Sequence, residues 1–459
     1  MRQSPPLRGA GWNVTPGAQV AAAIEILSAV DSGGRPADET AALYFRRRRY
    51  IGAKDRAEIA RHLYDVLRHR AALDWWIARL AADMPAAAAR TRALASLVLI
   101  AGWPPDRVAR CLDGGRFHPA PLSPAEARLV HGLAGRTLHH PDMPRAVRND
   151  VPEWLLPPLE RALGAGLERE IAGLNRPAPV DLRANPLKTD RAAAQRRLAA
   201  EGVDAEPTPW SPLGLRLEAR APLAALAAFR EGLVEVQDEG SQVAALLADA
   251  RPGMRVVDFC AGAGGKTLAL AAQMRNRGKL VACDVAPHRL ERAGRRLRRA
   301  GVDNVERRAL TGAHDPWVKR HKQSFDRVFV DAPCLGTGTW RRNPDAKWRL
   351  QPRDLAELTA CQRDILKSAA RLVRPGGRLV YATCSLLREE NEDQAAAFLA
   401  ETPDFAPVPA ALVWKETIGG NPPPGSGRYL RLTPARHGTD GFFVAIFERR
   451  TASFEQERQ

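Results

Sequence analysis

Two cysteines directly follow predicted β-strands, where a thiol could take part in chemistry. Cys334 follows the strand Arg327–Asp331 in the run Asp331-Ala-Pro-Cys334, and Cys384 closes the strand Arg378–Thr383. A free cysteine is commonly a small buried hydrophobe, and for either residue alone that alternative is equally good. Thiolate is the reactive form, and at an unperturbed pKa of about 8.5 it is a minor species near neutrality. A nucleophilic role therefore requires an electropositive site.

The stretch Met254–Leu270 predicts a turn that binds a nucleotide-like ligand. A hydrophobic strand leads into a turn with Gly262, Gly264 and Gly265, and a helix begins near Lys266. Glycines let the backbone approach a ligand and visit positive φ, and the helix amino terminus supplies unpaired N–H groups. An ordinary strand-to-helix turn is the structural alternative.

Spacing separates three loops that could occupy this turn. A dinucleotide fingerprint needs a third glycine where Thr267 stands, and a phosphate-cradling loop needs glycine in place of Cys260, although Gly265-Lys266-Thr267 fits that second loop. A loop for S-adenosylmethionine needs an acid at the end of the next strand, for the ribose hydroxyls. Asp284 ends the strand Lys279–Asp284, about 20 residues on, as expected for a ribose partner. We favour S-adenosylmethionine.

A methyl donor beside two cysteines suggests one reaction. Carbon 5 of cytosine is a poor nucleophile, and addition of a thiolate to carbon 6 converts the ring into an enamine-like nucleophile that can take a methyl group. Lys266 and the basic segment Trp340–Arg349 could favour the thiolate electrostatically.

The chain resembles the bacterial ribosomal RNA cytosine-5 methyltransferases of the Sun/Fmu group, within the S-adenosylmethionine-dependent RNA 5-methylcytosine family. The resemblance covers nearly the whole chain and rests on DFCAGAGGKT, VACDVAPHRL, DAPCLGTGTWRRNPDAKW, YATCS followed by ENEDQ, VEVQDEGSQ and HGTDGFFVAIFERR. It implies methylation of a cytosine at carbon 5 in RNA, with 16S ribosomal RNA as the expected substrate, through a covalent cysteine adduct.

The resemblance also implies residue roles. Cys384 would be the nucleophile, Cys334 the thiol that helps to release product, and Asp331 the contact to the cytosine N3 edge, with Lys266 beside them. The cofactor would contact Cys260, Ala261, Gly262, Ala263, Gly264, Gly265, Lys266, Asp284 and Asp331. The substrate RNA would contact Arg341, Arg342 and Lys347.

Two positions depart from the family pattern. Ala263 stands where the family loop usually has proline, a change that we expect only to loosen the turn. The acid that the family usually carries near the adenine should fall close to Leu310, where it is missing. Either Asp315 or backbone amides substitute for it, or cofactor affinity is reduced.

Composition supports a nucleic-acid partner. The 459 residues carry a formal net charge of +17, which favours a polyanionic partner, with a solvated arginine-rich bias as the alternative. Six cysteines without a C-x-x-C pair argue against disulfides and against a zinc site, so we expect no metal. No apolar run reaches the roughly 18 residues that a membrane span needs. We therefore expect a soluble, monomeric, cytoplasmic protein.

Periodicity predicts three domains. Residues 1–142 are helical after a Pro/Gly-rich start that we expect to be mobile, and they resemble the family's NusB-like RNA-binding domain. The run Arg46–Arg49 suits either RNA contact or a solvated helix end. Residues 143–233 form a small α/β adaptor with strands Val180–Asn185 and Leu213–Leu217.

Residues 234–459 alternate strands and helices, which predicts an α/β, Rossmann-like class I methyltransferase domain with a mostly parallel, doubly wound sheet. The predicted elements are strands Arg255–Phe259, Lys279–Asp284, Asn304–Arg308, Arg327–Asp331 and Arg378–Thr383, helices His288–Ala300 and Leu355–Leu372, and a turn at Arg374–Gly377. Ligands of such sheets bind at the carboxyl ends of the strands.

Three other classes remain open. An NTPase would need glycine at Cys260 and gives no reason for Cys384. An RNA-binding protein without a cofactor would explain the charge and Leu310, but not two thiols at strand ends. A DNA methyltransferase would use the cysteine of the Pro-Cys element, Cys334, as its nucleophile.

Overall fold

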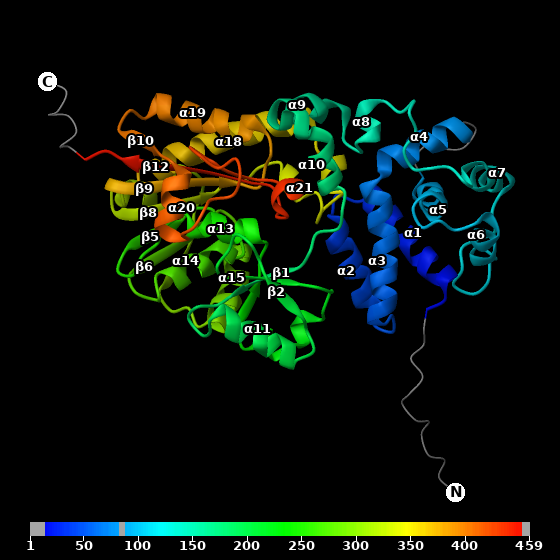
Figure 1. The fold of residues 1–459 in the computed structure, drawn as a ribbon, viewed down its shortest axis with the longest axis horizontal. Coiled ribbons are helices and arrows are strands. Elements are labelled where there is room, and N and C mark those ends of the chain that lie inside the picture. The colour runs from blue at the N-terminus through cyan, green and yellow to red at the C-terminus, as the bar shows by residue number, and fades with distance from the viewer. Residues whose placement is uncertain (1–13, 82–87, 452–459) are drawn as a thin grey trace, which may run out of the picture. The chain divides into compact units, whose positions relative to one another are not determined.

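The computed structural model describes residues 14–81 and 88–451 (Figure 1). The chain forms two compact units. The first runs to Leu156 and takes in Arg342–Arg349 as well, and the second contains Pro157–Arg341 and the chain from Leu350 onward. Most of the Pro/Gly-rich start, for which we predicted mobility, lies outside the described residues.

The described part of the first unit consists of helices and their connections. Thr15 caps the first helix by accepting a hydrogen bond from the N–H of Ala18, and Ser123 and Glu126 form a capping box at another. Apolar faces meet in one core that includes Ile26 and Trp76. The helices are α1 (Pro16–Ser32), α2 (Ala37–Arg47), α3 (Ala53–Arg68), α4 (Arg70–Leu80), α5 (Ala89–Leu99), α6 (Pro105–Cys111), α7 (Pro124–Leu133) and α8 (Arg145–Arg148). The helical prediction is confirmed, whereas likeness to NusB stays a prediction.

A short segment from far along the chain belongs to this helical unit. It contains α17 (Ala346–Arg349). Asp345 accepts a hydrogen bond from the N–H of Ala37 at 3.1 Å, and the ammonium of Lys347 donates to the carbonyl of Arg68 at 3.0 Å. The chain therefore leaves the second unit after residue 341 and returns to it at residue 350.

The second unit begins within α9 (Leu156–Leu163), at Pro157, and continues with α10 (Leu167–Leu174) and a small antiparallel sheet. Its strand order is β2 (Ala205–Pro207), β3 (Gly214–Leu217), β1 (Asp181–Ala184) and β4 (Val234–Val236), and α11 (Arg191–Ala200) follows β1 in the chain. β4 pairs with β1, with Val236 opposite Leu182. The predicted boundary at residue 234 is therefore too early, because β4 completes the adaptor sheet instead of starting the next one.

A larger sheet forms the rest of the unit. Its order is β10 (Phe405–Val408), β12 (Phe442–Arg449), β9 (Val373–Thr383), β8 (Phe325–Asp331), β5 (Arg255–Asp258), β6 (Lys279–Asp284) and β7 (Val305–Ala309), with β11 (Leu430–Leu432) paired to β12. The strands from β9 to β7 are parallel, and β12 runs antiparallel to β9. The predicted strands are confirmed with small end shifts, except that β9 begins at Val373 rather than at Arg378. The carboxyl-terminal strands were not predicted.

Helices cover both faces of this sheet (Figure 1). Successive residues of a strand point to opposite faces, so Val256 packs in the cluster with α13 (Glu239–Leu246), α14 (Gly265–Gln273) and α20 (Ala410–Thr417). Val257 packs in the opposite cluster with α16 (Pro316–Arg320), α18 (Pro352–Ala370) and α19 (Glu392–Glu401). α15 (Pro287–Ala300) buries Leu290 and Leu297. The doubly wound α/β prediction is confirmed.

Connectivity places a crevice at the middle of this sheet. From β5 the chain proceeds outward to β6 and β7, and then returns to the other side of β5 as β8. At such a reversal the connections after neighbouring strands diverge and leave room for a ligand at the carboxyl ends. The predicted turn Arg374–Gly377 lies within β9, where the pairing with β8 shifts register.

Candidate active site

A cavity of about 930 Å³ opens at the carboxyl ends of β5, β6, β8 and β9. Its lining includes the loop after β5, the end of β6 at Asp284, the end of β8 at Asp331, and Cys384 after β9. The volume is typical of a cavity for a small molecule or cofactor. The predicted site residues at the strand ends are therefore brought together, although they lie far apart in the sequence.

The glycine turn shapes one wall. Gly262 has φ +53°, and a Cβ built there would meet no described atom within 4 Å, so its open side faces the space that a ligand would fill. Gly264 has φ +82°, and a Cβ there would lie 2.9 Å from the Cβ of Ala293 in α15. Gly264 therefore packs the turn against α15 while its neighbours line the cavity, and its cofactor contact stays a prediction.

Asp284 ties the turn to the end of β6. Its two carboxylate oxygens accept hydrogen bonds from the N–H groups of Gly262 and Ala286, each at 2.8 Å. Each carboxylate oxygen has a second lone pair, so the group can also accept from a ribose hydroxyl. The other predicted cofactor residues that line the cavity are Cys260, Ala261, Ala263, Lys266 and Asp331, together with Gly265. These residues fit an adenosine-containing cofactor with a charged amino-acid end.

The region of the missing acid has an apolar and backbone surface. Leu310, Gly312 and Ala313 line the cavity. Asp315 caps α16 instead, because its oxygens accept from the N–H groups of Thr311 at 2.9 Å and Trp317 at 2.8 Å. Asp315 is therefore engaged in capping α16, and the two other predictions stand, substitution by backbone amides or a reduced cofactor affinity.

The two predicted thiols lie side by side on the cavity wall. The Sγ atoms of Cys334 and Cys384 are 3.5 Å apart, and both residues are half-buried. The hydrogen bond to Cys384, together with burial, holds the pKa of the Cys334 thiol well above its usual value. Cys334 therefore holds its proton more firmly than a free thiol does.

Lys266 supplies the positive charge next to this pair. Its ammonium donates to Asp331 Oδ2 at 2.6 Å. Burial alone would lower the pKa of Lys266, but the charges of Asp331 and Cys384 outweigh burial and raise it. Lys266 is therefore a permanent cation that can stabilise a thiolate at Cys384.

Sequence reasoning missed a buried acid behind the glycine turn. Asp258, fully buried at the end of β5, accepts a hydrogen bond from Thr267 Oγ1 at 2.6 Å and so ties β5 to the first turn of α14. Burial raises its pKa to about 7. Gln237 and Ser241 also line the cavity. Both residues lie in the run VEVQDEGSQ, which is part of the family resemblance, but the sequence alone assigned no role to either.

Two predicted RNA contacts are corrected. Arg341 is buried in ion pairs with Asp238 and Asp440, and Lys347 is fully buried with its ammonium on the carbonyl of Arg68. Neither cationic group is available to a phosphate. Arg342 is half-buried, and its RNA contact stays a prediction.

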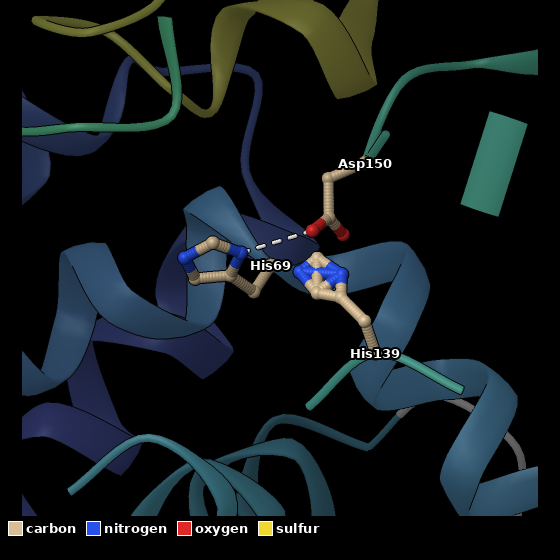
Figure 2. Close-up of side chains that lie close together, drawn as sticks. All are labelled: His69, His139 and Asp150. Atoms are coloured by element: carbon tan, nitrogen blue, oxygen red, sulfur yellow. Dashed lines mark hydrogen bonds and ion pairs between the residues drawn. The ribbon is translucent and has the colours of Figure 1, made fainter. Parts of the chain in front are cut away.

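A cluster in the helical unit, His69, His139 and Asp150, has a spacing that could hold a metal ion (Figure 2). Asp150 accepts from His69 Nδ1 at 2.9 Å through one oxygen and from the N–H of Ala72 at 3.0 Å through the other. The buried ammonium of Lys347 interacts electrostatically with Asp150 and would repel a divalent cation. We therefore assign Asp150 to capping the start of α4.

Family models match two stretches of the chain. The model of the 16S rRNA methyltransferases RsmB/F matches residues 245–448, and the model of the ferredoxin-like domain of RsmF/B-like methyltransferases matches residues 151–224. The second match agrees with the small antiparallel sheet and its helices, and the first with the larger sheet.

Curated relatives carry the corresponding names. The "ribosomal RNA small subunit methyltransferase B" of Salmonella typhi is 38% identical over 255 residues, which cover 56% of this chain and 59% of that protein. The "probable ribosomal RNA small subunit methyltransferase B" of Bacillus subtilis is 33% identical over 306 residues, 66% of this chain and 68% of that protein. The chain thus spans 59% of the length of the Salmonella relative.

Solved structures share the fold. The crystal structure of PH0851 superposes with a TM-score of 0.77 and 28% identity, covering 95% of this chain and 99% of that one. A methyltransferase homolog protein from Pyrococcus horikoshii gives a TM-score of 0.56 and 29% identity, covering 67% and 97%. Among the described residues, no helix is long and apolar enough to cross a bilayer.

Proposed function

Since the chain belongs to the RsmB/F family of 16S rRNA methyltransferases, we propose that it methylates carbon 5 of a cytosine in 16S ribosomal RNA through a covalent cysteine adduct. S-adenosylmethionine is the cofactor. The observation that carries the proposal is the pair of thiols 3.5 Å apart, on the wall of one cavity with Lys266 and Asp331. A cavity built only to bind RNA would have no use for this arrangement.

Cys384 begins the reaction. The target base must first leave its stack to reach the cavity. The thiolate of Cys384, stabilised by Lys266, forms a bond to carbon 6, and the electrons of the C5–C6 double bond move toward carbon 5. Asp331 lies beside Lys266, where it can hold the N3 edge of the ring. When bound, S-adenosylmethionine supplies an electrophilic methyl group, which carbon 5 takes.

Cys334 completes the reaction. In the adduct Cys384 is a thioether, so it no longer opposes ionisation of Cys334. The pKa of Cys334 falls, its proton goes to solvent, and its thiolate can remove the proton from carbon 5. The electrons of that C–H bond restore the C5–C6 double bond. The bond between Cys384 sulfur and carbon 6 breaks, and the electron pair returns to sulfur.

Replacement of each cysteine tests the assignment. Cys384→Ala removes the nucleophile, so neither methylation nor a covalent adduct should form on 16S rRNA. Cys334→Ala should attack and methylate once and then remain bound, visible as a slow-migrating band that survives denaturation. A stable adduct in Cys384→Ala and none in Cys334→Ala would reverse the roles. Activity in both variants without adducts would reduce the thiols to core packing.

Ligand binding tests the class of enzyme. Calorimetry should detect saturable binding of S-adenosylmethionine and none of ATP. Saturable ATP binding without binding of the methyl donor would contradict the methyltransferase proposal.

A further inference from the structure

Two adjacent buried residues contact the turns that carry the two thiols. Glu390 ends a short 3₁₀ turn (Arg388–Glu390), and Asn391 stands between that turn and α19. Glu390 is fully buried and Asn391 is 3% exposed. Neither has a place in the reaction steps derived above.

Glu390 holds the Cys334 turn. Its Oε1 accepts from the N–H of Leu335, the residue after Cys334, at 2.9 Å, and from Gln362 Nε2 at 3.1 Å. The same Gln362 nitrogen donates at 2.9 Å to the carbonyl of Pro333, the residue before Cys334. Cys334 is thus flanked on both sides by hydrogen bonds that lead to Glu390.

Asn391 holds the Cys384 turn in the same way. Its Oδ1 accepts from Thr383 Oγ1 at 2.5 Å, and its Nδ2 donates to the carbonyl of Ser385 at 2.9 Å. Thr383 and Ser385 flank Cys384 in the chain. Because Glu390 and Asn391 are joined by one peptide bond, the two turns share one anchor.

We propose that Glu390 and Asn391 are positioning residues that hold Cys334 and Cys384 at the spacing the two-thiol reaction needs. The proposal rests on the proposed function. It assigns a separate step to each half of the anchor: Asn391 serves attack by Cys384, and Glu390 serves release through Cys334. A displacement of about 1 Å can slow an enzymatic step on the order of 10²-fold, so loss of either half should be visible.

Glu390 also has an electrostatic effect on its turn. Burial raises the pKa of Glu390 itself, against the effect of hydrogen bonds that include one with the Ser385 side chain. When ionised, its negative charge is one of the smaller causes that raise the pKa of Cys334, after the bond to Cys384 and burial. Glu390→Gln keeps an acceptor for Leu335 and removes the charge. Release by this variant should therefore reach its full rate at a lower pH than in the wild type, a change that a purely structural role would not produce.

The full chain is tested with S-adenosylmethionine and an unmodified 16S rRNA transcript, with methyl incorporation and covalent adduct followed over one turnover. Glu390→Ala should methylate once and accumulate adduct, with release slowed on the order of 10²-fold. Asn391→Ala should form little adduct and methylate more slowly by a similar factor. Glu390→Gln should restore most of the release rate. Asp393→Asn, which removes an exposed acid from α19, is the matched control and should behave as the wild type.

Thermal unfolding and calorimetry with S-adenosylmethionine separate positioning from loss of fold. The proposal is overturned if Glu390→Ala and Asn391→Ala slow attack and release equally, or if neither variant alters the adduct while both remain folded. Should Glu390→Ala fail to fold, the pH shift in Glu390→Gln decides alone, and an unshifted profile overturns the role of Glu390.

A readout without RNA keeps this test distinct from the proposed function. Diamide takes two electrons and two protons from a pair of thiols and joins them as a disulfide, which mass spectrometry locates. In the wild type the Cys334–Cys384 disulfide should form rapidly, and Glu390→Ala and Asn391→Ala should each form it at least tenfold more slowly, unlike Asp393→Asn. If the wild type fails to methylate RNA, the proposed function fails, while unchanged disulfide rates in both variants would overturn the anchor itself.

Discussion

At the scale of single residues, neighbouring groups in the site determine which side chains hold their protons. Lys266 stays charged because Asp331 and Cys384 raise its pKa against the opposing effect of burial. Cys334 keeps its proton because Cys384 is 3.5 Å away. The two thiols therefore have different surroundings, although each directly follows a strand.

The buried Asp258 carboxyl should make stability depend on pH. Its folded pKa of about 7 is raised from 3.8, so between these values the folded state binds more protons than the unfolded state. The wild type should lose stability relative to Asp258→Asn as pH rises through this window, by at most about 1.4 kcal/mol per pH unit. Parallel unfolding curves of the two proteins at pH 4.5, 6 and 7.5 test this. A constant difference across that range would contradict it.

At the scale of elements, the glycine turn provides open space beside Gly262 and close packing of Gly264 against α15. Gly262 leaves room on the cavity side, whereas Gly264 lets α15 approach the turn. Asp284 and Asp258 then fix the two ends of the turn by hydrogen bonds. The cofactor wall is thus held by strands β5 and β6 and by two helices.

Substitution of Gly264 should disrupt this packing. Gly264→Ala combines a left-handed backbone with a Cβ 2.9 Å from that of Ala293, and we expect a loss of roughly 1–3 kcal/mol in stability with weaker binding of S-adenosylmethionine. Gly253→Ala is the matched control, because its φ is +90° but a Cβ there meets no described atom within 4 Å. Calorimetry and thermal unfolding of both variants give the comparison, and equal effects would argue against the contact with α15.

The buried ammonium of Lys347, in the segment 342–349 of the helical unit, should make stability depend on pH. Burial lowers the pKa of Lys347 from 10.5 to about 8, so between these values the unfolded state binds more protons and wild-type stability rises with pH. Lys347→Met should remove this rise, at most about 1.4 kcal/mol per pH unit. Unfolding at pH 7.5, 9 and 10 measures it. The salt dependence of RNA binding should be unchanged, and a reduced dependence would restore Lys347 as a phosphate contact.

At the scale of the whole molecule, the positive charge and the course of the chain between the two units decide how RNA binding can be tested. The net charge of +17 favours binding of a polyanion such as RNA. In the run Arg46–Arg49 at the carboxyl end of α2, Arg46, Arg47 and Arg49 are exposed, whereas Arg48 pairs with Glu25. Removal of residues 1–142 would delete Ala37 and Arg68, which Asp345 and Lys347 contact. Surface variants therefore test RNA binding better than truncation does.

RNA affinity should fall steeply with salt, and Arg46, Arg47 and Arg49 should carry part of that dependence. Replacing all three by serine should reduce the log–log slope by about 2, at roughly 0.7 per phosphate contact on a single strand, without changing cofactor affinity. Arg292, Arg295 and Arg298, exposed on α15, are the matched set with the same loss of charge. Equal effects of the two sets would indicate diffuse attraction, and no salt dependence in the wild type would make the charge mere solvation.

The local sequence pattern was sufficient to predict the strands that carry the site, the glycine turn, Asp284 and both thiols. Strand periodicity and turn residues are local signals, and the carboxyl ends of parallel strands meet at one edge of a sheet. The cavity was therefore predictable from Asp331, Cys334 and Cys384 before their distances were known. The family resemblance supplied the order of the two thiols.

Tertiary structure decided which charged and polar residues are free to act. Arg341 is paired with Asp238 and Asp440, and Lys347 is buried against Arg68, through contacts that no local pattern encodes. The same holds for β4, whose partner β1 lies some fifty residues earlier, and for the anchor formed by Glu390 and Asn391. Burial and pairing depend on which distant segments meet, and side-chain chemistry follows from that environment.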